Sequence, residues 1–277
     1  MILTNKNNLP EAVFHWLKSL NDHNEAARAK SIEEYKSKYP AKFEQSISVT
    51  SLMKSAREVV LLDRHHDEVV REASDIYDAI IGTAVHDSFK VMPMRENEER
   101  EVRIGCVING VLVHGEFDDL LNMNLADYKT MKIGGYIFGD KEAEYIQQTS
   151  SYRFCYYVER GKLINEMATI ILIFVDFRPT EYKNKKYGFS PAPNYPFKSV
   201  EIPIIMWPIE RTERWITRRV ADYRVASLLQ DDELPLCTDA ECWMRAGKKK
   251  TTYAKCEQYC SAAPFCNQAL SRIPGGN

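Results

Sequence analysis

The sequence has no apolar run as long as the roughly 20 residues that a membrane-spanning helix needs. Its most apolar stretch, ATIILIFVDF, is short and rich in β-branched residues, so it predicts a buried strand. The first residues, MILTNKNNLPEAVFHW, lack the basic segment and apolar core of a secretory signal. These absences favour a cytoplasmic protein with no membrane partner.

A strong net charge and a nucleotide-binding loop are missing as well. The 37 Lys and Arg residues and 39 Asp and Glu residues leave a net charge of −2, which argues against a protein that coats nucleic acid by bulk charge. A local basic groove is compatible with this balance. The sequence contains no G-x-x-x-x-G-K-[ST] loop, which excludes an ATP motor of that kind.

The apolar spacing divides the chain into helical and strand-like parts. The N-terminal part predicts helices over 9–22, 24–40, 48–65 and about 67–91. The apolar pattern after residue 100 predicts a meander of strands over 101–108, 111–121 and 125–130, followed by a helix over 140–161. Beyond this helix it predicts strands over 166–177 and 199–207, separated by a loop over 182–197, and a final helix over 210–230. The order helix, three-stranded meander, helix, strand predicts an α/β core with a mixed sheet.

The stretch GEFDDLLNMNLADYKT brings two acids and a base to neighbouring predicted strands. The dipeptide Asn109-Gly110 predicts the hairpin that leads into it. Asp118 lies near the end of one strand, and strand alternation puts Asp127 and Lys129 on one face of the next. Charged groups on a buried sheet face are costly unless they bind something. A divalent cation held by the two carboxylates would remove this cost.

The same segment, with its flanks, resembles a nuclease family. GEFDDLL followed by LADYKT resembles the D…(D/E)xK signature of the PD-(D/E)XK nuclease superfamily. IGTAVHDSF resembles the G-x-x-x-H helix of its RecB-type branch, which includes the AddB nuclease domain and the CRISPR-associated adaptation nucleases. QTSSY resembles the Q-x-x-x-Y motif of that branch. The resemblance covers about residues 50–177 and implies a restriction-endonuclease-like core.

The resemblance also implies roles for individual residues in phosphodiester hydrolysis. Asp118 and Asp127 would be the principal ligands of Mg²⁺ or Mn²⁺, with the carbonyl oxygen of Tyr128 as a further ligand. His86 would add an imidazole, which Mn²⁺ accepts more readily than Mg²⁺ does. Lys129 would orient or deprotonate the attacking water, or stabilise the charge that develops on the phosphate.

Two further motif residues and three alternatives complete the predicted catalytic set. Gln148 and Tyr152 are spaced i, i+4, so they share a helix face and would hydrogen-bond near the metal or the DNA backbone. Glu116 and His114 share the predicted face of Asp118, and Glu116 would assist it. Gln147 is the alternative to Gln148.

Five of the seven cysteines lie within the C-terminal part, which in an intracellular protein favours a metal site over disulfides. Three of them form a C-x3-C-x5-C triplet, namely Cys256, Cys260 and Cys266. The triplet resembles that of iron–sulfur members of the RecB branch, whose fourth cysteine usually lies upstream of the core. Ser55 stands at that position here. We therefore favour Cys237, in a layout that resembles phage-type nucleases, over Cys242 as the fourth ligand of a [4Fe–4S] cluster, with zinc as the alternative.

Three basic runs, interleaved with aromatic residues, favour contacts with the DNA backbone and bases: YKNKKYGF, ERTERWITRR and RAGKKKTTYAK. With the resemblance, they predict a metal-dependent DNA exonuclease that acts on ends or single strands, without sequence preference, in recombination, repair or phage DNA processing. Its predicted location is the cytoplasm of a bacterium or a phage-infected host, where a recombination protein is a candidate partner.

Two alternatives and a domain division accompany this prediction. The first alternative is a structure-specific endonuclease on the same fold. The second is a non-catalytic DNA-binding or regulatory protein, against which the intact Asp118, Asp127 and Lys129 set argues. The predicted regions are an N-terminal helical region over 1–48, a nuclease core over 49–230 and a cysteine-rich helical region over 231–277.

Overall fold

The computed structural model describes residues 1–39, 43–138, 141–177, 198–246 and 251–272. The chain divides into two compact units, each assembled from segments that lie far apart in the sequence. The first unit comprises Met1–Ile76, Val107–Val113 and Arg214–Asn277, and the second comprises Tyr77–Cys106 and His114–Glu213. The predicted division into three consecutive regions follows the sequence instead and stays a prediction.

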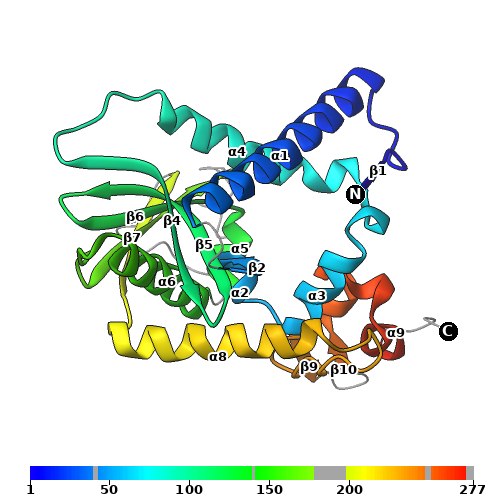
Figure 1. Cartoon of the computed structure of the whole chain (residues 1–277). Coiled ribbons are helices and arrows are strands. Elements are labelled where there is room, and N and C mark those ends of the chain that lie inside the picture. Colours follow the sequence, from blue (N-terminus) through cyan, green and yellow to red (C-terminus); the bar gives the residue numbers. More distant parts are fainter. Residues whose placement is uncertain (40–42, 139–140, 178–197, 247–250, 273–277) are drawn as a thin grey trace. The chain divides into compact units, whose positions relative to one another are not determined.

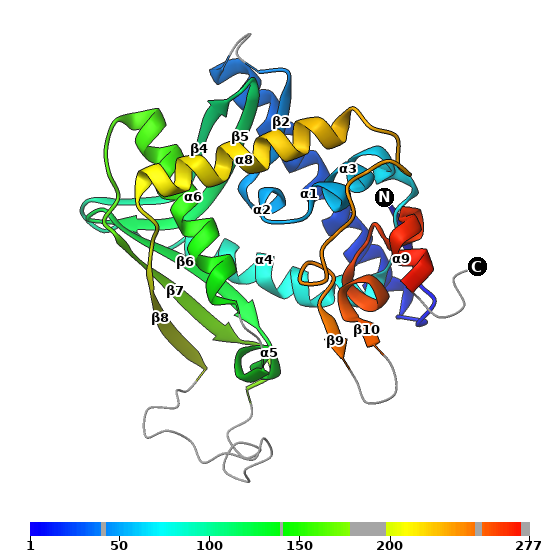
Figure 2. The ribbon, with the colours of Figure 1, turned by 90° about the horizontal axis from the view of Figure 1, so that it is seen from below.

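The second unit is built on a mixed β-sheet (Figure 1). Strands lie in the order β5 (Val111–Leu121), β6 (Asn124–Met131), β7 (Met167–Phe174) and β8 (Ser199–Ile205), and β4 (Glu98–Ile108) pairs with β5. Figure 2 shows β6, β7 and β8 side by side; β6 and β7 are parallel, and the β5–β6 and β7–β8 pairs are antiparallel. The helices of this unit are α4 (Tyr77–Lys90), α5 (Ile133–Phe138) and α6 (Glu142–Arg160).

Residues with left-handed backbone conformations shape the connections of the sheet. Asn109 and Gly110, with φ of 49° and 76°, close the β4–β5 hairpin that the sequence predicts. Asn122 and Met123, with φ of 49° and 63°, join β5 to β6 by a second two-residue turn. Gly161, with φ of 65°, ends α6 as predicted. These turns fix the register on which the site depends.

The core of the second unit lies between the sheet and α6. Alternate residues of β7 are buried, namely Ala168, Ile170, Leu172 and Phe174. Helix α6 buries every residue from Gln148 to Tyr156. Phe117 of β5 contacts the rings of Tyr152 and Tyr156. The motif residues of α6 are therefore held by packing rather than exposed on a helix surface.

The first unit combines long and very short elements. It contains α1 (Glu11–Lys38), the parallel pair β1 (Ile2–Thr4) and β3 (Val70–Glu72), helices α2 (Val49–Leu52) and α3 (Ala56–Arg64), and residues 214–227 of α8 (Ile209–Ser227). Strand β2 (Gln45–Ser48) pairs with β5, whose first residues belong to this unit. Near the C-terminus lie β9 (Met244–Ala246), β10 (Thr251–Tyr253), a π-helical turn at Lys255–Tyr259 and α9 (Asn267–Arg272).

The predicted order of helix, three-stranded meander, helix and strand is confirmed, as are the N-terminal helices. Two predicted N-terminal helices are the single helix α1. The helix predicted over 48–65 is interrupted, because Ser55 accepts a hydrogen bond from the Glu58 N–H and caps a new helix, α3.

The helix predicted from about residue 67 begins only at Tyr77. Val70–Glu72 instead pairs with Ile2–Thr4, which no local pattern indicates. Helix α5 is also unpredicted, and the cysteine-rich region contains the two short strands β9 and β10. The loop predicted over 182–197 lies outside the described residues.

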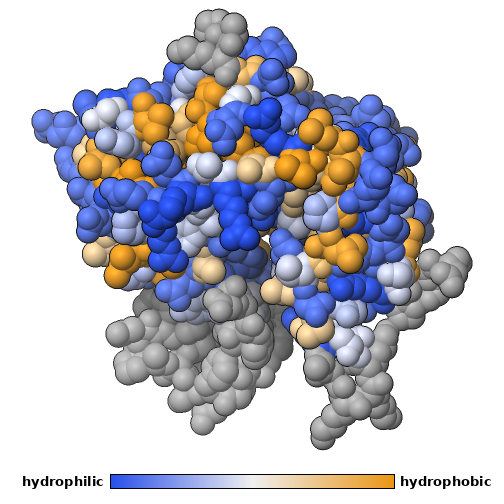
Figure 3. All heavy atoms as spheres, turned by 60° about the horizontal axis from the view of Figure 1, so that its bottom comes forward, coloured by the Kyte–Doolittle hydropathy of each residue, from blue (hydrophilic) through white to orange (hydrophobic). Residues whose placement is uncertain are grey.

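Among the helices of the described residues, none combines the length and the hydropathy that a membrane span requires. The face drawn in Figure 3 mixes polar and charged side chains with smaller apolar groups. Such a mixture is ordinary for a chain with 27% charged residues and a net charge of −2.

Candidate functional site

Acidic side chains from three neighbouring strands meet in the second unit. Counting outward from the β4–β5 turn sets Arg103 opposite Glu116, and Glu101 opposite Asp118. A distance of 2.7 Å between Arg103 Nε and Glu116 Oε2 agrees with this register. Because cross-strand partners point to the same face, Glu101 and Asp118 lie together.

The next strand adds Asp127. The β5–β6 ladder ends where Asp119 pairs with Ala126, and one further step would set Asp118 opposite Asp127. At this position a side-chain hydrogen bond replaces the backbone pairing: Oδ2 of Asp118 accepts a hydrogen bond of 2.6 Å from the Tyr128 N–H. This bond fixes Asp118 between the two strands.

Helix α4 supplies the imidazole of His86. Its Nδ1 lies 3.1 Å from Oδ1 of Asp118. The helix comes close to β6, since a Cβ added to Gly82 would lie 3.0 Å from Oγ1 of Thr130. The glycine of the G-x-x-x-H motif therefore permits the approach that brings His86, one turn later, to the carboxylate.

Three side chains form a candidate cation site. One ligand atom each of His86, Glu101 and Asp118 lies within 4.8 Å of the others, and all three residues are half-buried. Burial and a hydrogen bond with Glu116 raise the pKa of Glu101 to about 7. A hydrogen bond with Asp118 raises the pKa of His86. The raised pKa values of Glu101 and His86 favour bound protons at these two groups, and a divalent cation with nitrogen and oxygen ligands fits in place of the protons.

Asp127 and Lys129 form an ion pair beside this group. Lys129 Nζ lies 2.7 Å from Asp127 Oδ2, and the Asp127 side chain is 2% exposed. Burial raises the pKa of Asp127, and the Lys129 charge opposes that rise. Asp127 is not one of the three residues whose ligand atoms gather within 4.8 Å. Its role as a ligand, and that of the Tyr128 carbonyl, stay predictions.

Gln148 and Tyr152 share one face of α6 as predicted. Gln148 Nε2 donates a hydrogen bond of 2.8 Å to the Tyr152 hydroxyl, and both side chains are buried. Burial, and then the charge of Asp127, raise the pKa of Tyr152 well above its ordinary value. The pair therefore lies near the acidic group, and its part in the chemistry stays a prediction.

A pocket of about 170 Å³ opens beside the three candidate ligands. Lys90, Arg95 and Arg100 line it together with Phe89, Met92, Pro93, Tyr128, His86, Glu101 and Asp118. Arg100 shapes the wall, because it donates to the carbonyls of Phe89, Met92 and Pro93. Lys90 Nζ lies 3.6 Å from Glu101. The pocket thus sets cationic groups next to a candidate metal site, as an anionic ligand would require.

The sequence motifs indicate neither Glu101 nor the pocket residues Lys90 and Arg95. Glu101 could have been found from the sequence. The register of the predicted hairpin places it opposite Asp118, so the signal was present in the spacing. Its φ of 49° lies in the left-handed region, where a non-glycine residue is uncommon within a strand. Of the alternatives, Glu116 contacts Arg103 and is hydrogen-bonded with Glu101.

The five C-terminal cysteines line one pocket of about 20 Å³ in the first unit: Cys237, Cys242, Cys256, Cys260 and Cys266. Ser55 Oγ lies 3.1 Å from Cys237 Sγ, so Cys237 reaches the place where the resemblance predicts a cysteine on the helix. Among the described residues, no three cysteine sulfurs lie within 4.8 Å of one another. A tetrahedral zinc centre with Zn–S bonds of about 2.3 Å needs a closer set.

The basic runs have mixed roles. In ERTERWITRR, Arg211 stacks on Trp207 at 4.4 Å, whereas Arg219 donates to the carbonyls of Leu52 and Lys54 and so is part of the fold. YKNKKYGF lies outside the described residues, as does part of RAGKKKTTYAK.

No family model and no curated protein matches the sequence. Among solved structures, the chain is similar to the crystal structure of SSO0001, with a TM-score of 0.50 and 18% identity over 89% of this chain and 96% of that chain. This likeness bears on the fold alone.

Two lower-scoring likenesses add no argument. One is to a phage-related exonuclease from Haemophilus somnus 129PT, with a TM-score of 0.38 and 13% identity over 65% of this chain and 92% of that chain. The other is to an alkaline exonuclease, LHK-Exo, from Laribacter hongkongensis, with a TM-score of 0.35 and 10% identity over 68% of this chain and 91% of that chain.

Proposed function

We propose that the protein is a metal-dependent DNA exonuclease that hydrolyses phosphodiester bonds at DNA ends or in single strands. One observation carries the proposal: ligand atoms of His86, Glu101 and Asp118 gather within 4.8 Å of one another at a pocket lined by Lys90 and Arg95. A site for a cation next to a site for an anion suits a phosphate ester, because its hydrolysis needs charge neutralisation at the phosphorus centre.

The charged side chains of the site would have separate roles in phosphodiester hydrolysis. His86, Glu101 and Asp118 would hold Mg²⁺ or Mn²⁺, and the nitrogen ligand favours Mn²⁺. When bound, the cation would offset charge on the phosphate oxygens. Lys90 and Arg95, on the pocket wall, would bind the phosphate of the DNA backbone. Lys129, 2.7 Å from Asp127, would orient the attacking water or stabilise the charge that develops on the phosphate.

We also propose a metal centre at the cysteine pocket, with Cys237, Cys256, Cys260 and Cys266 as ligands. The soft thiol set suits a [4Fe–4S] cluster or zinc. The likeness of the cysteine triplet to that of iron–sulfur nucleases favours the cluster, and zinc is the alternative. Such a centre would tie the C-terminal region to α3 without taking part in cleavage.

The test compares end-labelled linear DNA, circular single strands and circular duplexes, each with Mg²⁺ or Mn²⁺ and with a chelator. An exonuclease degrades linear DNA and leaves circles intact. Cleavage of circles would instead support the structure-specific endonuclease. Binding without cleavage of any substrate would support a DNA-binding or regulatory protein.

Asp118→Asn provides the matched variant. The asparagine keeps an oxygen that accepts the Tyr128 N–H, so the strands stay joined while the ligand charge is lost. Cleavage should fall at least about 100-fold. Glu96→Gln, which removes an exposed carboxylate between α4 and β4, is the control and should retain activity. Equal activity of both variants would contradict the assignment of the site.

A further inference from the structure

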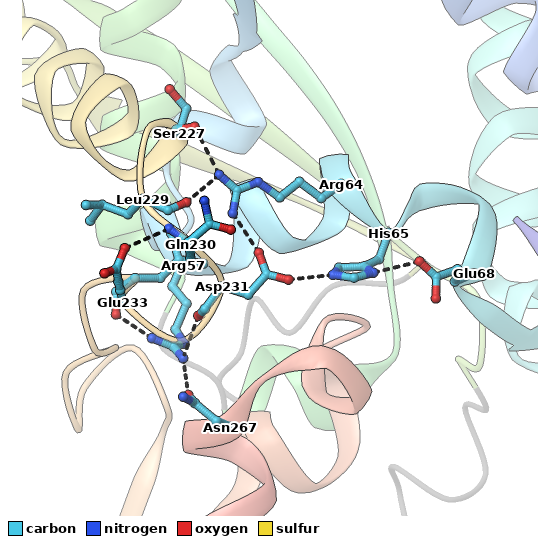
Figure 4. A network of polar contacts seen from close by, with 11 residues as sticks. Arg57, Arg64, His65, Glu68, Ser227, Leu229, Gln230, Asp231, Glu233 and Asn267 are labelled. Atoms are coloured by element: carbon cyan, nitrogen blue, oxygen red, sulfur yellow. Dashed lines mark hydrogen bonds and ion pairs between the residues drawn. The ribbon is translucent and has the colours of Figure 1, made fainter.

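Arg57 is a fully buried cation in the first unit. Its side chain is among the largest that are fully buried, and the residue is 1% exposed. The Nε atom lies 3.1 Å from Cys266 Sγ. The other donors reach the carbonyls of Leu234 and Asp231 and the side-chain oxygen of Asn267. Figure 4 shows the guanidinium between Asp231 and Asn267.

All these acceptors are formally neutral if Cys266 is a thiol. Within the described parts of the chain, no ion pair joins Arg57 to a carboxylate, and the adjacent Glu58 pairs with Lys54 and Lys255 at 3.5 and 2.6 Å. Arg57 also lies in the first turn of α3, where the helix dipole disfavours a cation. A buried charge with no counter-charge is costly, so the position of Arg57 requires an anion that the neutral thiols do not supply.

The cysteine pocket supplies that anion once a metal binds. Without a metal, ordinary cysteine thiols are mostly protonated at neutral pH, so the thiols of this pocket supply no counter-charge to Arg57. Metal ligands bind as thiolates, and binding releases their protons. Four thiolates around a metal centre carry a net negative charge next to the guanidinium.

We infer that Arg57 is the buried counter-charge of a thiolate–metal centre and donates a charge-assisted hydrogen bond to the sulfur of Cys266. This inference rests on the proposed centre at the cysteine pocket and not on DNA cleavage. Arg57 is a positioning residue, which acts through the sulfur that it contacts. Hydrogen bonds to ligand sulfurs and the charge near a cluster set its stability and its reduction potential.

The test uses the full chain purified without oxygen, with bound iron, sulfide and zinc measured per chain. Arg57→Gln removes the charge and keeps an amide donor, whereas Arg57→Lys keeps the charge and fewer donors. Arg64→Gln is the matched control, because Arg64 on the same helix donates to Asp231 and to the carbonyls of Ser227 and Leu229 but contacts no sulfur (Figure 4).

Under an excess of chelator, Arg57→Gln should lose the metal about 10–100 times more readily than the wild type. Arg57→Lys should recover part of the retention, and Arg64→Gln should behave as the wild type. If the centre is a cluster, Arg57→Gln should also lower its reduction potential, because a nearby positive charge stabilises the reduced form.

Equal metal retention in Arg57→Gln and the wild type would overturn the inference, as would an equal loss in Arg64→Gln. If Arg57→Gln fails to fold, Arg57→Lys decides: retention near the wild type supports the charge, and loss of all metal overturns it. A wild-type protein without bound iron or zinc also overturns it, while the cleavage test of the other site is unaffected.

Discussion

Replacement of Glu101 by glutamine should stabilise the metal-free protein while weakening its cation site. Glu101 lies opposite Asp118, and burial, together with the neighbouring Glu116, raises its pKa to about 7. Lys90, at 3.6 Å, offsets part of this effect. Glutamine has the same size and cannot ionise, so it resembles the protonated carboxyl and leaves the left-handed backbone at this position unchanged.

The sign and size of the effect follow from proton linkage. The ordinary pKa of the group is 4.5 and its folded value is about 7, so between these values the folded state binds more protons than the unfolded state. Stability therefore falls as the pH rises through this window. The full difference corresponds to at most about 3 kcal/mol. Because the carboxyl is partly exposed, solvent screening lowers the expected cost to about 1–2 kcal/mol.

Urea unfolding in the presence of a chelator, followed by circular dichroism at pH 5 and pH 8, measures this cost. Glu101→Gln should be about 1–2 kcal/mol more stable than the wild type at pH 8, and about a quarter of this gain should remain at pH 5. Its affinity for Mn²⁺, measured by electron paramagnetic resonance, should fall about 10–100-fold. Glu201→Gln, at an exposed position of β8 in the same sheet, is the control for both. A stability gain that is the same at both pH values, or an unchanged Mn²⁺ affinity, would refute the reasoning.

Three further predictions concern other contacts. Gly82→Ala should displace α4 and weaken Mn²⁺ binding about tenfold. Gly134→Ala is the control, because its added carbon meets nothing within 4 Å, and it should bind Mn²⁺ as the wild type does. Equal Mn²⁺ affinities of the two variants would contradict the packing role of Gly82. Lys129→Met should destabilise the metal-free protein by about 1–3 kcal/mol in urea unfolding, because Asp127 stays buried, and adding Asp127→Asn should restore most of the loss. His65→Gln should lower Tm at pH 6 and have less effect at pH 9. Hydrogen bonds with the carboxylates of Asp231 and Glu68 raise the pKa of His65 above 6.5, and the stability that they contribute is lost as the pH rises through the pKa of the folded state. A Tm difference independent of pH would argue against this role of His65.

Local chemistry predicted the parts of the fold that depend on a few neighbouring residues. Asn109–Gly110 and Gly161 are examples, because a turn or a helix end requires a left-handed residue at one position. The helix predicted over Val70–Glu72 was wrong, because the structure of this segment depends on a distant partner and not on its neighbours in the sequence. This strand of three residues forms by pairing with Ile2–Thr4, far away in the sequence, and three residues carry no measurable periodicity. Helical spacing in the surrounding segment therefore decided the prediction.

The candidate site was predictable where a motif names the residue and where strand alternation sets its face. Asp118, Asp127 and Lys129 come from adjacent strands, and His86 lies beside Asp118. Glu101 was not predicted because the D…(D/E)xK signature covers only β5 and β6, and Glu101 lies on β4. The register of the β4–β5 hairpin nevertheless places the Glu101 carboxylate opposite Asp118. The ion pair of Asp127 with Lys129 could not be inferred, since alternation puts two groups on one face without saying which atoms meet.

The two proposed metal centres differ in the hardness of their donors and in their burial, and the two properties have different consequences. The carboxylates and the imidazole are half-buried, and the pKa of Glu101 is about 7, so a hard cation there would compete with protons and exchange with solvent. The thiols line a small pocket beside a buried arginine, so a soft metal there would be enclosed and its charge would be balanced from within the protein. An exchangeable cation suits a site that must admit a phosphate ester, and an enclosed centre suits a structural role. The chemistry of each donor set thus argues independently for the function proposed for it.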